Sequence, residues 1–140
     1  MPSAVNEPRV VDASVIVKVL VQEALSDRAV ALFESDAIKI VPAHAAAEVC
    51  EVMLRKWRKG EVDGADVRRL PVLLRDRFDV VSLEELLPEA LEIAAEASIT
   101  FYDSLYVAAA VRRRCRLVTC DHAMPARLAP TRYAPFALAL

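Results

Sequence analysis

Short apolar segments rich in β-branched residues alternate with longer helical patterns along the chain, and this alternation restricts the fold more than any other feature of the sequence. Each short segment has the length and composition of a strand. The predicted strands are Arg9–Val11, Ile38–Val41, Asp79–Ser82 and Arg116–Thr119. Strands separated by helices pair in parallel, and right-handed crossovers place the helices on both faces of the sheet. The sequence therefore predicts an α/β fold with a mainly parallel central sheet.

The segments between the predicted strands show the periodicity of amphipathic helices. Two of these helices are predicted around Leu86–Ala94 and Tyr102–Arg113. The clearest helix ends just before Gly60, which stands where a left-handed C-cap residue belongs. The apolar stripe of that helix is formed by Ala46, Val49, Cys50, Met53, Leu54 and Trp57.

Polar residues and proline mark the expected starts of the remaining helices. Ser14 and Ser26 are predicted to be the N-caps of two helices between the first and second strands. Another helix is predicted to begin at Asp63 or Asp66. It contains Pro71, which either kinks the helix or marks its true start.

Length and composition indicate one compact domain. With 140 residues, of which 56% are apolar, we expect a single domain over residues 1–140, with residues 1–8 as an N-terminal extension. The apolar run Leu105–Val111 is far below the roughly 20 residues that cross a bilayer, and no signal segment precedes it. We therefore expect a cytoplasmic protein without membrane contact. The three cysteines lack a C-x-x-C spacing and predict neither a disulfide nor a zinc site.

Two aspartates directly follow predicted strands. Asp12 follows the first strand and Asp121 follows the fourth, so both belong to the edge where the carboxyl ends of parallel strands meet and where open sheets bind ligands. Ser14 and Thr119 each place a hydroxyl two residues from one of these carboxylates. Hard divalent cations such as Mg²⁺ prefer such all-oxygen surroundings. Helix capping is the alternative role of a lone aspartate at this position.

Two further acidic residues lie at helix starts. Asp103 precedes a strongly apolar helix, so it either complements the helix dipole or, being near the core, needs a partner or a metal ion. Glu48 lies almost opposite the apolar stripe of its own helix, and periodicity alone predicts a solvated side chain.

Four blocks of sequence, taken in order, resemble those of PIN-domain proteins, and most closely the VapC-type toxins of prokaryotic toxin–antitoxin systems. The similarity extends from Val10 to Asp121. No single block is specific, but their order and spacing are. The blocks are Val11–Ser14, Pro42 with Glu48–Val49, Tyr102–Ala110, and Leu117–Asp121.

The resemblance implies a three-layer α/β/α sandwich and a ribonuclease that depends on Mg²⁺ or Mn²⁺. It further implies an RNA substrate, a small antitoxin partner and a homodimer. Ser14 and Thr119 would be supporting hydroxyls of the site. The carboxylates implied for catalysis and metal binding are Asp12, Glu48, Asp103 and Asp121. The chain departs from the pattern at Glu51, where the family often has asparagine, and in residues 1–8, which precede the pattern.

Other polar residues carry two interpretations each. His44, one turn before Glu48, either borders the acidic site or is an ordinary residue at a helix start. Two basic clusters either complement helix C-termini or contact the RNA backbone. These clusters are Arg55, Lys56, Arg58 and Lys59, and Arg112, Arg113, Arg114 and Arg116.

Two other classes of function remain as alternatives. An aspartyl-phosphate receiver or phosphatase also uses an aspartate at the end of a strand. The phosphatase signature requires Asp-x-Asp, however, and Ser14 stands in place of its second aspartate. The acidic pair that a receiver needs near its first strand is also missing. The other alternative is a PIN-like binding module without turnover, against which the presence of all four acids argues.

Overall fold

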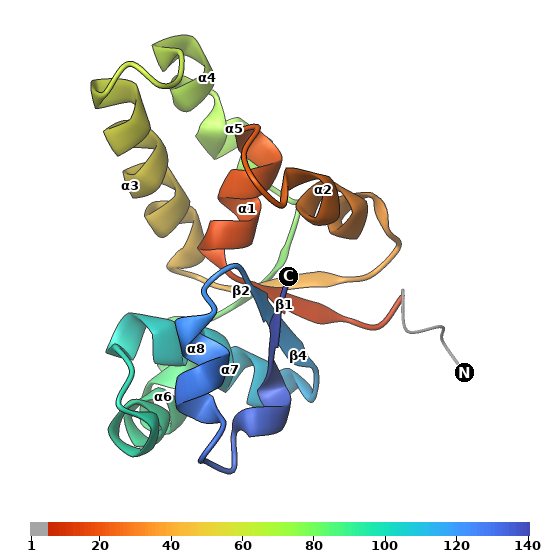
Figure 1. The fold of residues 1–140 in the computed structure, drawn as a ribbon, viewed down its shortest axis with the longest axis vertical. Helices are drawn as coiled ribbons and strands as arrows, with labels where there is room; N and C mark the ends of the chain where they lie inside the picture. Colours follow the sequence, from red (N-terminus) through yellow and green to blue (C-terminus); the bar gives the residue numbers. More distant parts are fainter. Residues whose placement is uncertain (1–5) are drawn as a thin grey trace.

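A parallel sheet of five strands forms the centre of the computed structural model, which describes residues 6–140 (Figure 1). The strand order is β3-β2-β1-β4-β5, and all four pairings are parallel. The strands are β1 (Arg9–Val11), β2 (Lys39–Pro42), β3 (Asp79–Val81), β4 (Arg116–Thr119) and β5 (Ala137–Ala139). The predicted α/β fold with a parallel sheet is confirmed.

Helices cover both faces of the sheet. In Figure 1, α1 to α5 lie on one side of the strands and α6 to α8 on the other, which confirms the three-layer sandwich. On the first side are α1 (Ala13–Leu20), α2 (Ser26–Glu34), α3 (Ala45–Arg58), α4 (Gly64–Arg68) and α5 (Leu70–Leu74). On the second side are α6 (Leu83–Ala97), α7 (Phe101–Arg113) and α8 (Ala123–Leu128), and a short 3-10 turn, Ala134–Phe136, precedes β5.

Helix α7 is the most deeply buried helix of the domain. Every residue from Ser104 to Ala110 is buried, and the helix packs against β1, β2 and β4. Three consecutive alanines, from Ala108 to Ala110, let the helix approach the strands closely because they carry no bulk beyond Cβ. This packing fixes the start of α7, and with it Asp103, against the sheet.

The chain changes direction across the sheet between β1 and β4. From the central β1 it proceeds outward through β2 and β3, and it then crosses to β4 and β5 on the other side of β1. At the carboxyl ends of the two central strands the Asp12 N–H donates to the Val118 carbonyl at 3.1 Å. Such a topological switch point is where open α/β sheets bind their ligands.

Several local predictions are wrong. Asp12, not Ser14, is the N-cap of α1, and Ser26 is the first residue of α2 rather than its cap. Both serine hydroxyls bond elsewhere, Ser14 to the Asp12 carboxylate and Ser26 to the Val21 carbonyl. The prediction for the next helix is confirmed at its start, because Asp63 is the N-cap of α4 and its carboxylate accepts the Ala65 N–H. Of the two roles predicted for Pro71, the structure shows a helix start, since Pro71 lies in the first turn of a separate short helix, α5.

Other differences lie near the ends of the chain. Strand β5 was not expected, because Ala137–Ala139 contains no β-branched residue. Of the predicted N-terminal extension 1–8, residues 1–5 lie outside the described part. Over residues 6–140, no helix combines the length and apolar character that a membrane span requires.

Candidate active site

Asp12 is the buried centre of the site. Its side chain follows β1 at the switch point, and the residue is only 8% exposed. The hydroxyl of Thr119 donates to Asp12 Oδ2 at 2.6 Å, and that of Ser14 donates to the same oxygen at 3.0 Å. Because both bonds use one oxygen, the other carboxylate oxygen is left for a further ligand.

The two hydroxyls also hold the loop after β4. Ser14 Oγ accepts the backbone N–H of Cys120 at 3.2 Å, and Thr119 Oγ1 accepts that of Asp121 at 3.0 Å. Each hydroxyl therefore links the Asp12 carboxylate to the segment that carries Asp121. The sequence placed both hydroxyls near the carboxylates, and the structure shows the bonds that keep them there.

Glu48 contacts both its own helix and the opposite layer. The Tyr106 hydroxyl donates to Glu48 Oε1 at 2.9 Å, and His44 Nε2 lies 2.8 Å from the same oxygen. The side chain is 36% exposed, so it keeps contact with solvent as periodicity predicted, but periodicity did not indicate the bond to Tyr106.

Tyr106 and His44 support Glu48, and sequence reasoning did not give Tyr106 this role. Tyr106 is fully buried, and its burial, together with the charges of Asp12 and Glu48, raises the pKa of its hydroxyl far above the usual value. The hydroxyl therefore stays protonated and donates. For His44 the i,i+4 spacing to Glu48 was the available signal.

Asp103 and Asp121 both line a cavity of about 180 Å³. The N-cap Thr100 accepts the Asp103 N–H at 3.1 Å and so fixes the first turn of α7. Asp121 is exposed, and its Oδ1 accepts the Ala123 N–H at 2.9 Å at the start of α8. Arg127 also lines this cavity.

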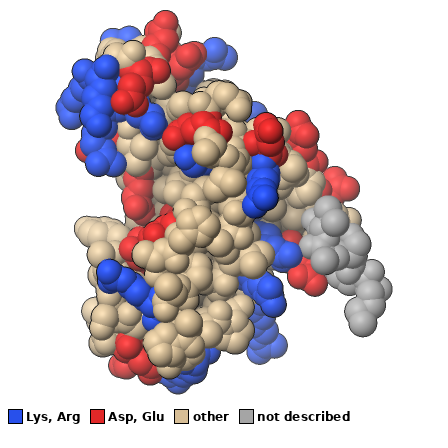
Figure 2. All heavy atoms as spheres, viewed as in Figure 1, with Lys and Arg blue, Asp and Glu red and all other residues tan. Residues whose placement is uncertain are grey.

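The four predicted carboxylates lie at one end of the sheet, close enough for their charges to affect the pKa values of Asp12 and Asp103. Burial raises the pKa of Asp12, and the charges of Asp103 and Glu48 add to this, although the two hydroxyls oppose it. Burial also raises the pKa of Asp103, with further contributions from Glu48 and Asp121. Figure 2 shows acidic side chains gathered in the hollow between α3 and the layer of α6 to α8.

The donor set suits a hard divalent cation. It offers carboxylate and hydroxyl oxygens, and the carboxylates repel one another in a way that a positive charge would relieve. Within residues 6–140, no three Asp, Glu, His or Cys side chains are close enough to form a ready-made site for one ion. Mg²⁺ is commonly bound through one or two carboxylates and retains several waters. The residues present therefore fit such an ion.

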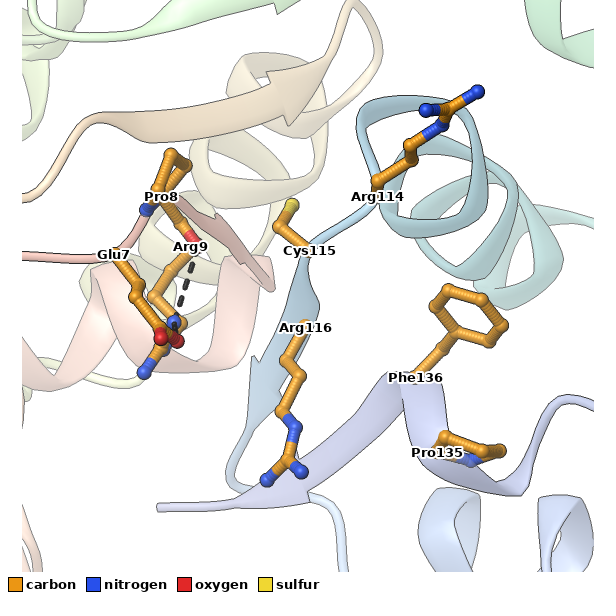
Figure 3. A pocket seen from close by; sticks show the side chains of 8 residues that line it. All are labelled: Glu7, Pro8, Arg9, Arg114, Cys115, Arg116, Pro135 and Phe136. Carbon is orange, nitrogen blue, oxygen red and sulfur yellow. Dashed lines mark hydrogen bonds and ion pairs between the residues drawn. The ribbon is translucent and has the colours of Figure 1, made fainter. Parts of the chain in front are cut away.

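The second basic cluster lies at the other end of α7, away from the carboxylates. Arg112 pairs with Glu85 at 3.3 Å and Arg113 with Asp79 at 2.6 Å. Arg114 and Arg116 line a cavity of about 540 Å³ at the amino ends of β1 and β4, where Figure 3 shows their side chains pointing in opposite directions. These arginines therefore do not converge on the acidic site.

The motifs at the strand ends also match a known family. A family model described as PIN domain covers residues 9–128. The chain belongs to the PIN domain family. The resemblance inferred from the four blocks of sequence is thereby confirmed. Curated proteins gave no significant match in sequence.

Solved structures share the PIN fold of this chain. The PAE2754 protein of Pyrobaculum aerophilum is 26% identical, with a TM-score of 0.67, and the match covers 91% of this chain and 81% of that one. VapC20 of Mycobacterium tuberculosis, a toxin that cleaves the sarcin–ricin loop, is 16% identical with a TM-score of 0.68, over 84% and 93% of the two chains. A toxin–antitoxin complex from Klebsiella pneumoniae is 13% identical with a TM-score of 0.64, over 93% and 95%.

Proposed function

We propose that this PIN-domain protein is an endoribonuclease that depends on Mg²⁺ or Mn²⁺. The observation that supports it best is the buried Asp12 at the switch point, held by two hydroxyls and coupled in charge to Glu48 and Asp103. Asp12, Glu48, Asp103 and Asp121 are proposed as the catalytic and metal-binding carboxylates, with Ser14 and Thr119 as supporting hydroxyls. We also propose that residues 1–140 belong to a single domain.

The chemistry follows from where negative charge develops. Hydrolysis of a phosphodiester places charge on the attacking and leaving oxygens, and a bound divalent ion supplies neutralisation and a water of lowered pKa. Asp12 and Asp103 would hold the ion. Burial is the main reason that the pKa of each is raised, and the neighbouring carboxylates add to it, so a bound cation would offset both effects. Tyr106 and His44 orient the Glu48 carboxylate, and Thr119 and Ser14 orient that of Asp12.

We further propose that the protein is the toxin of a toxin–antitoxin pair and acts in the cytoplasm as a homodimer. The structural similarity to VapC20 and to toxin–antitoxin complexes supports an antitoxin partner. Exposed apolar side chains at Val72 in α5 and at Leu87 and Leu91 in α6 support self-association. Expression of the chain with and without a neighbouring small reading frame tests the toxin role, because growth arrest should occur only without the antitoxin.

Asp103→Asn provides the direct test of the ribonuclease. The amide keeps the shape of the side chain but removes a charge that holds the ion, so RNA cleavage should fall to a small fraction of wild type while the fold is retained. Excess chelator should abolish wild-type cleavage, and Mg²⁺ or Mn²⁺ should restore it. Undiminished cleavage by Asp103→Asn in chelator would reject the proposal. A phosphoreceiver or a silent binding module would cleave no RNA with any metal.

A further inference from the structure

A groove of about 360 Å³ adjoins the acidic site between α1, α3 and the loop after β4. Ser14 and Asp121 line both the groove and the candidate active site, so the two spaces are continuous. Lys18 and Lys56 also line it. Its remaining walls are formed by Val17, Glu23, Val52 and Cys120.

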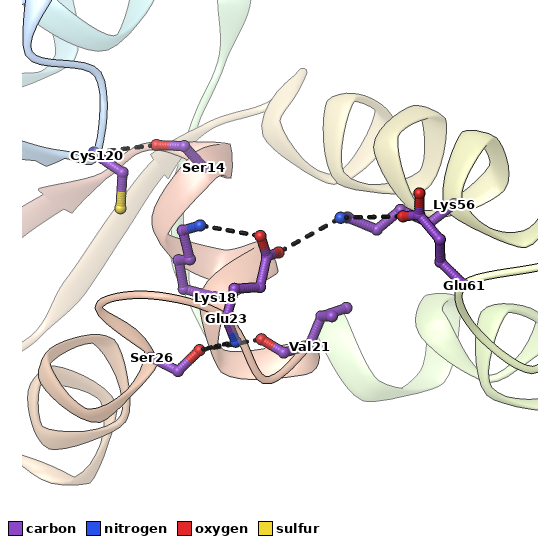
Figure 4. Close-up of polar contacts among 8 residues, drawn as sticks. All are labelled: Ser14, Lys18, Val21, Glu23, Ser26, Lys56, Glu61 and Cys120. Atoms are coloured by element: carbon purple, nitrogen blue, oxygen red, sulfur yellow. Dashed lines mark hydrogen bonds and ion pairs between the residues drawn. The ribbon is translucent and has the colours of Figure 1, made fainter. Parts of the chain in front are cut away.

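The Glu23 carboxylate bridges the two lysines of this groove. Glu23 Oε2 accepts from Lys18 Nζ at 3.0 Å, and Glu23 Oε1 lies 3.5 Å from Lys56 Nζ (Figure 4). Lys56 Nζ also lies 3.6 Å from Glu61 Oε2. Each lysine side chain is 20% exposed, so both ammonium groups retain access to the groove. Their charges outweigh the effect of burial and lower the pKa of Glu23.

The loop between α1 and α2 is built to present Glu23 at this place. The buried Ser26 hydroxyl accepts the Glu23 N–H at 2.9 Å and donates to the Val21 carbonyl at 3.0 Å. Leu25 adopts a left-handed conformation, with φ of 69°, to complete the turn. The position of Glu23 is therefore fixed by the backbone and not only by its contact with the lysines.

We infer that Lys18 and Lys56 bind successive backbone phosphates of the RNA next to the scissile bond, and that Glu23 occupies their ammonium groups until a phosphate displaces it. This inference rests on the proposed ribonuclease function. Lysine is a compact point charge that binds phosphate oxygens as well as carboxylate oxygens. The groove walls carry no aromatic side chain on which a base could stack, which favours binding through the backbone.

The salt dependence of RNA binding tests the two lysines. Fluorescence anisotropy with a labelled oligouridylate, in excess chelator to prevent cleavage, gives the slope of log K against log salt concentration. Each phosphate contact to a single strand contributes about 0.7 to this slope, so K18Q/K56Q should reduce it by about 1.4. Lys39→Gln is the matched control, because Lys39 bonds to the Ser35 carbonyl at the amino end of β2 and should leave the slope unchanged.

Glu23→Gln should act in the opposite direction. Removal of the competing charge should tighten RNA binding by roughly two- to fivefold, as expected when the weak ion pairs of Glu23 with Lys18 and Lys56 no longer have to be broken. The slope should stay as in wild type, since both lysines remain. If the ion pairs of Glu23 with Lys18 and Lys56 were only structural, Glu23→Gln and K18Q/K56Q would both lower the Tm. Glu23→Gln would then not raise the RNA affinity, and K18Q/K56Q would not lower it.

The outcomes separate this inference from the proposed function. An unchanged slope for K18Q/K56Q in a protein that cleaves RNA would overturn the assignment of the lysines and leave the ribonuclease intact. If K18Q/K56Q bound a polyglutamate peptide more weakly than wild type but bound RNA equally well, the groove would be assigned to an acidic protein segment and the RNA assignment would be overturned. Absence of cleavage by wild type with either metal would reject the proposed function itself.

Discussion

Replacing Thr119 by valine removes one hydroxyl from the candidate site but keeps the β-branched shape that suits a strand. Thr119 is fully buried; its hydroxyl donates to the Asp12 carboxylate at 2.6 Å and accepts the Asp121 N–H at 3.0 Å. A hydrogen bond to a charged group contributes about 1.5–3 kcal/mol, and the second bond adds up to about 1 kcal/mol. We therefore expect Thr119→Val to lower the free energy of unfolding by about 1.5–4 kcal/mol at neutral pH.

This cost should depend on pH, because the main acceptor titrates. The Thr119 hydroxyl lowers the pKa of Asp12 against the raising effect of burial, so the ionised carboxylate gains most from the bond. As pH falls through the raised pKa of Asp12, the carboxyl takes up a proton and the charge-dependent part of the cost is lost. The difference in stability between wild type and Thr119→Val should be largest at neutral and higher pH and should narrow in acid.

Thr131→Val is the matched control. The Thr131 hydroxyl also donates once, to the Leu128 carbonyl at 2.7 Å, and accepts once, from the Tyr133 N–H at 3.1 Å. Its acceptor does not titrate, so its cost of about 0.5–1.5 kcal/mol should not change with pH.

Thermal unfolding followed by circular dichroism in chelator, over a series of pH values from mildly alkaline to acid, measures both effects. Thr119→Val should lower the Tm by roughly 5–15 °C at the highest pH. A decrease no larger than that of Thr131→Val, or one that stays equal over the whole pH series, would refute the reasoning.

Three further predictions follow from the charges and exposed surface. Asp103→Asn should be at least as stable as wild type to chemical denaturation in chelator, because its repulsion by Glu48 and Asp121 is removed; a clear loss of stability would contradict this. The metal-free protein should gain stability as pH falls through the raised pKa values of Asp12 and Asp103. The increase in Tm on adding Mg²⁺, measured against samples in chelator, should therefore be larger near neutral pH than in acid. Leu91→Lys in α6 should lower the molar mass found by light scattering and should remove the dependence of the Tm on protein concentration, and a monomeric wild type would exclude the homodimer.

The parts of the fold that could be predicted are those in which local pattern and burial agree. Strands β1 and β4 and the buried helix α7 lie where apolar runs placed them, because each is covered on both sides by other elements. Gly60 follows α3 in the left-handed conformation that the sequence indicated, with φ of 75°.

The errors arise where a side chain bonds to a partner distant in sequence. The hydroxyls of Ser14 and Ser26 look like helix caps locally, but Ser14 links Asp12 to Cys120 and Ser26 closes the loop that carries Glu23. A helical wheel describes the faces of one helix and contains no information on contacts with other elements. It therefore could not indicate that Tyr106, from the opposite layer, donates a hydrogen bond to Glu48. The four sequence blocks were sufficient to select the candidate carboxylates, whereas the sequence did not indicate that Tyr106 orients one of them.

The bonds that build the site join distant parts of the chain, which has a consequence during synthesis. Asp12 and Thr119 are 107 residues apart, and Glu48 and Tyr106 are 58 apart. A growing chain that ends before β4 lacks Thr119 and Asp121, and contacts of such long sequence separation form late and slowly. The acidic site therefore exists only after the chain has been synthesised through β4 and the following loop and has folded. Under the proposed ribonuclease function, a partner that recognises the assembled site has the whole time of translation and folding in which to bind before cleavage begins.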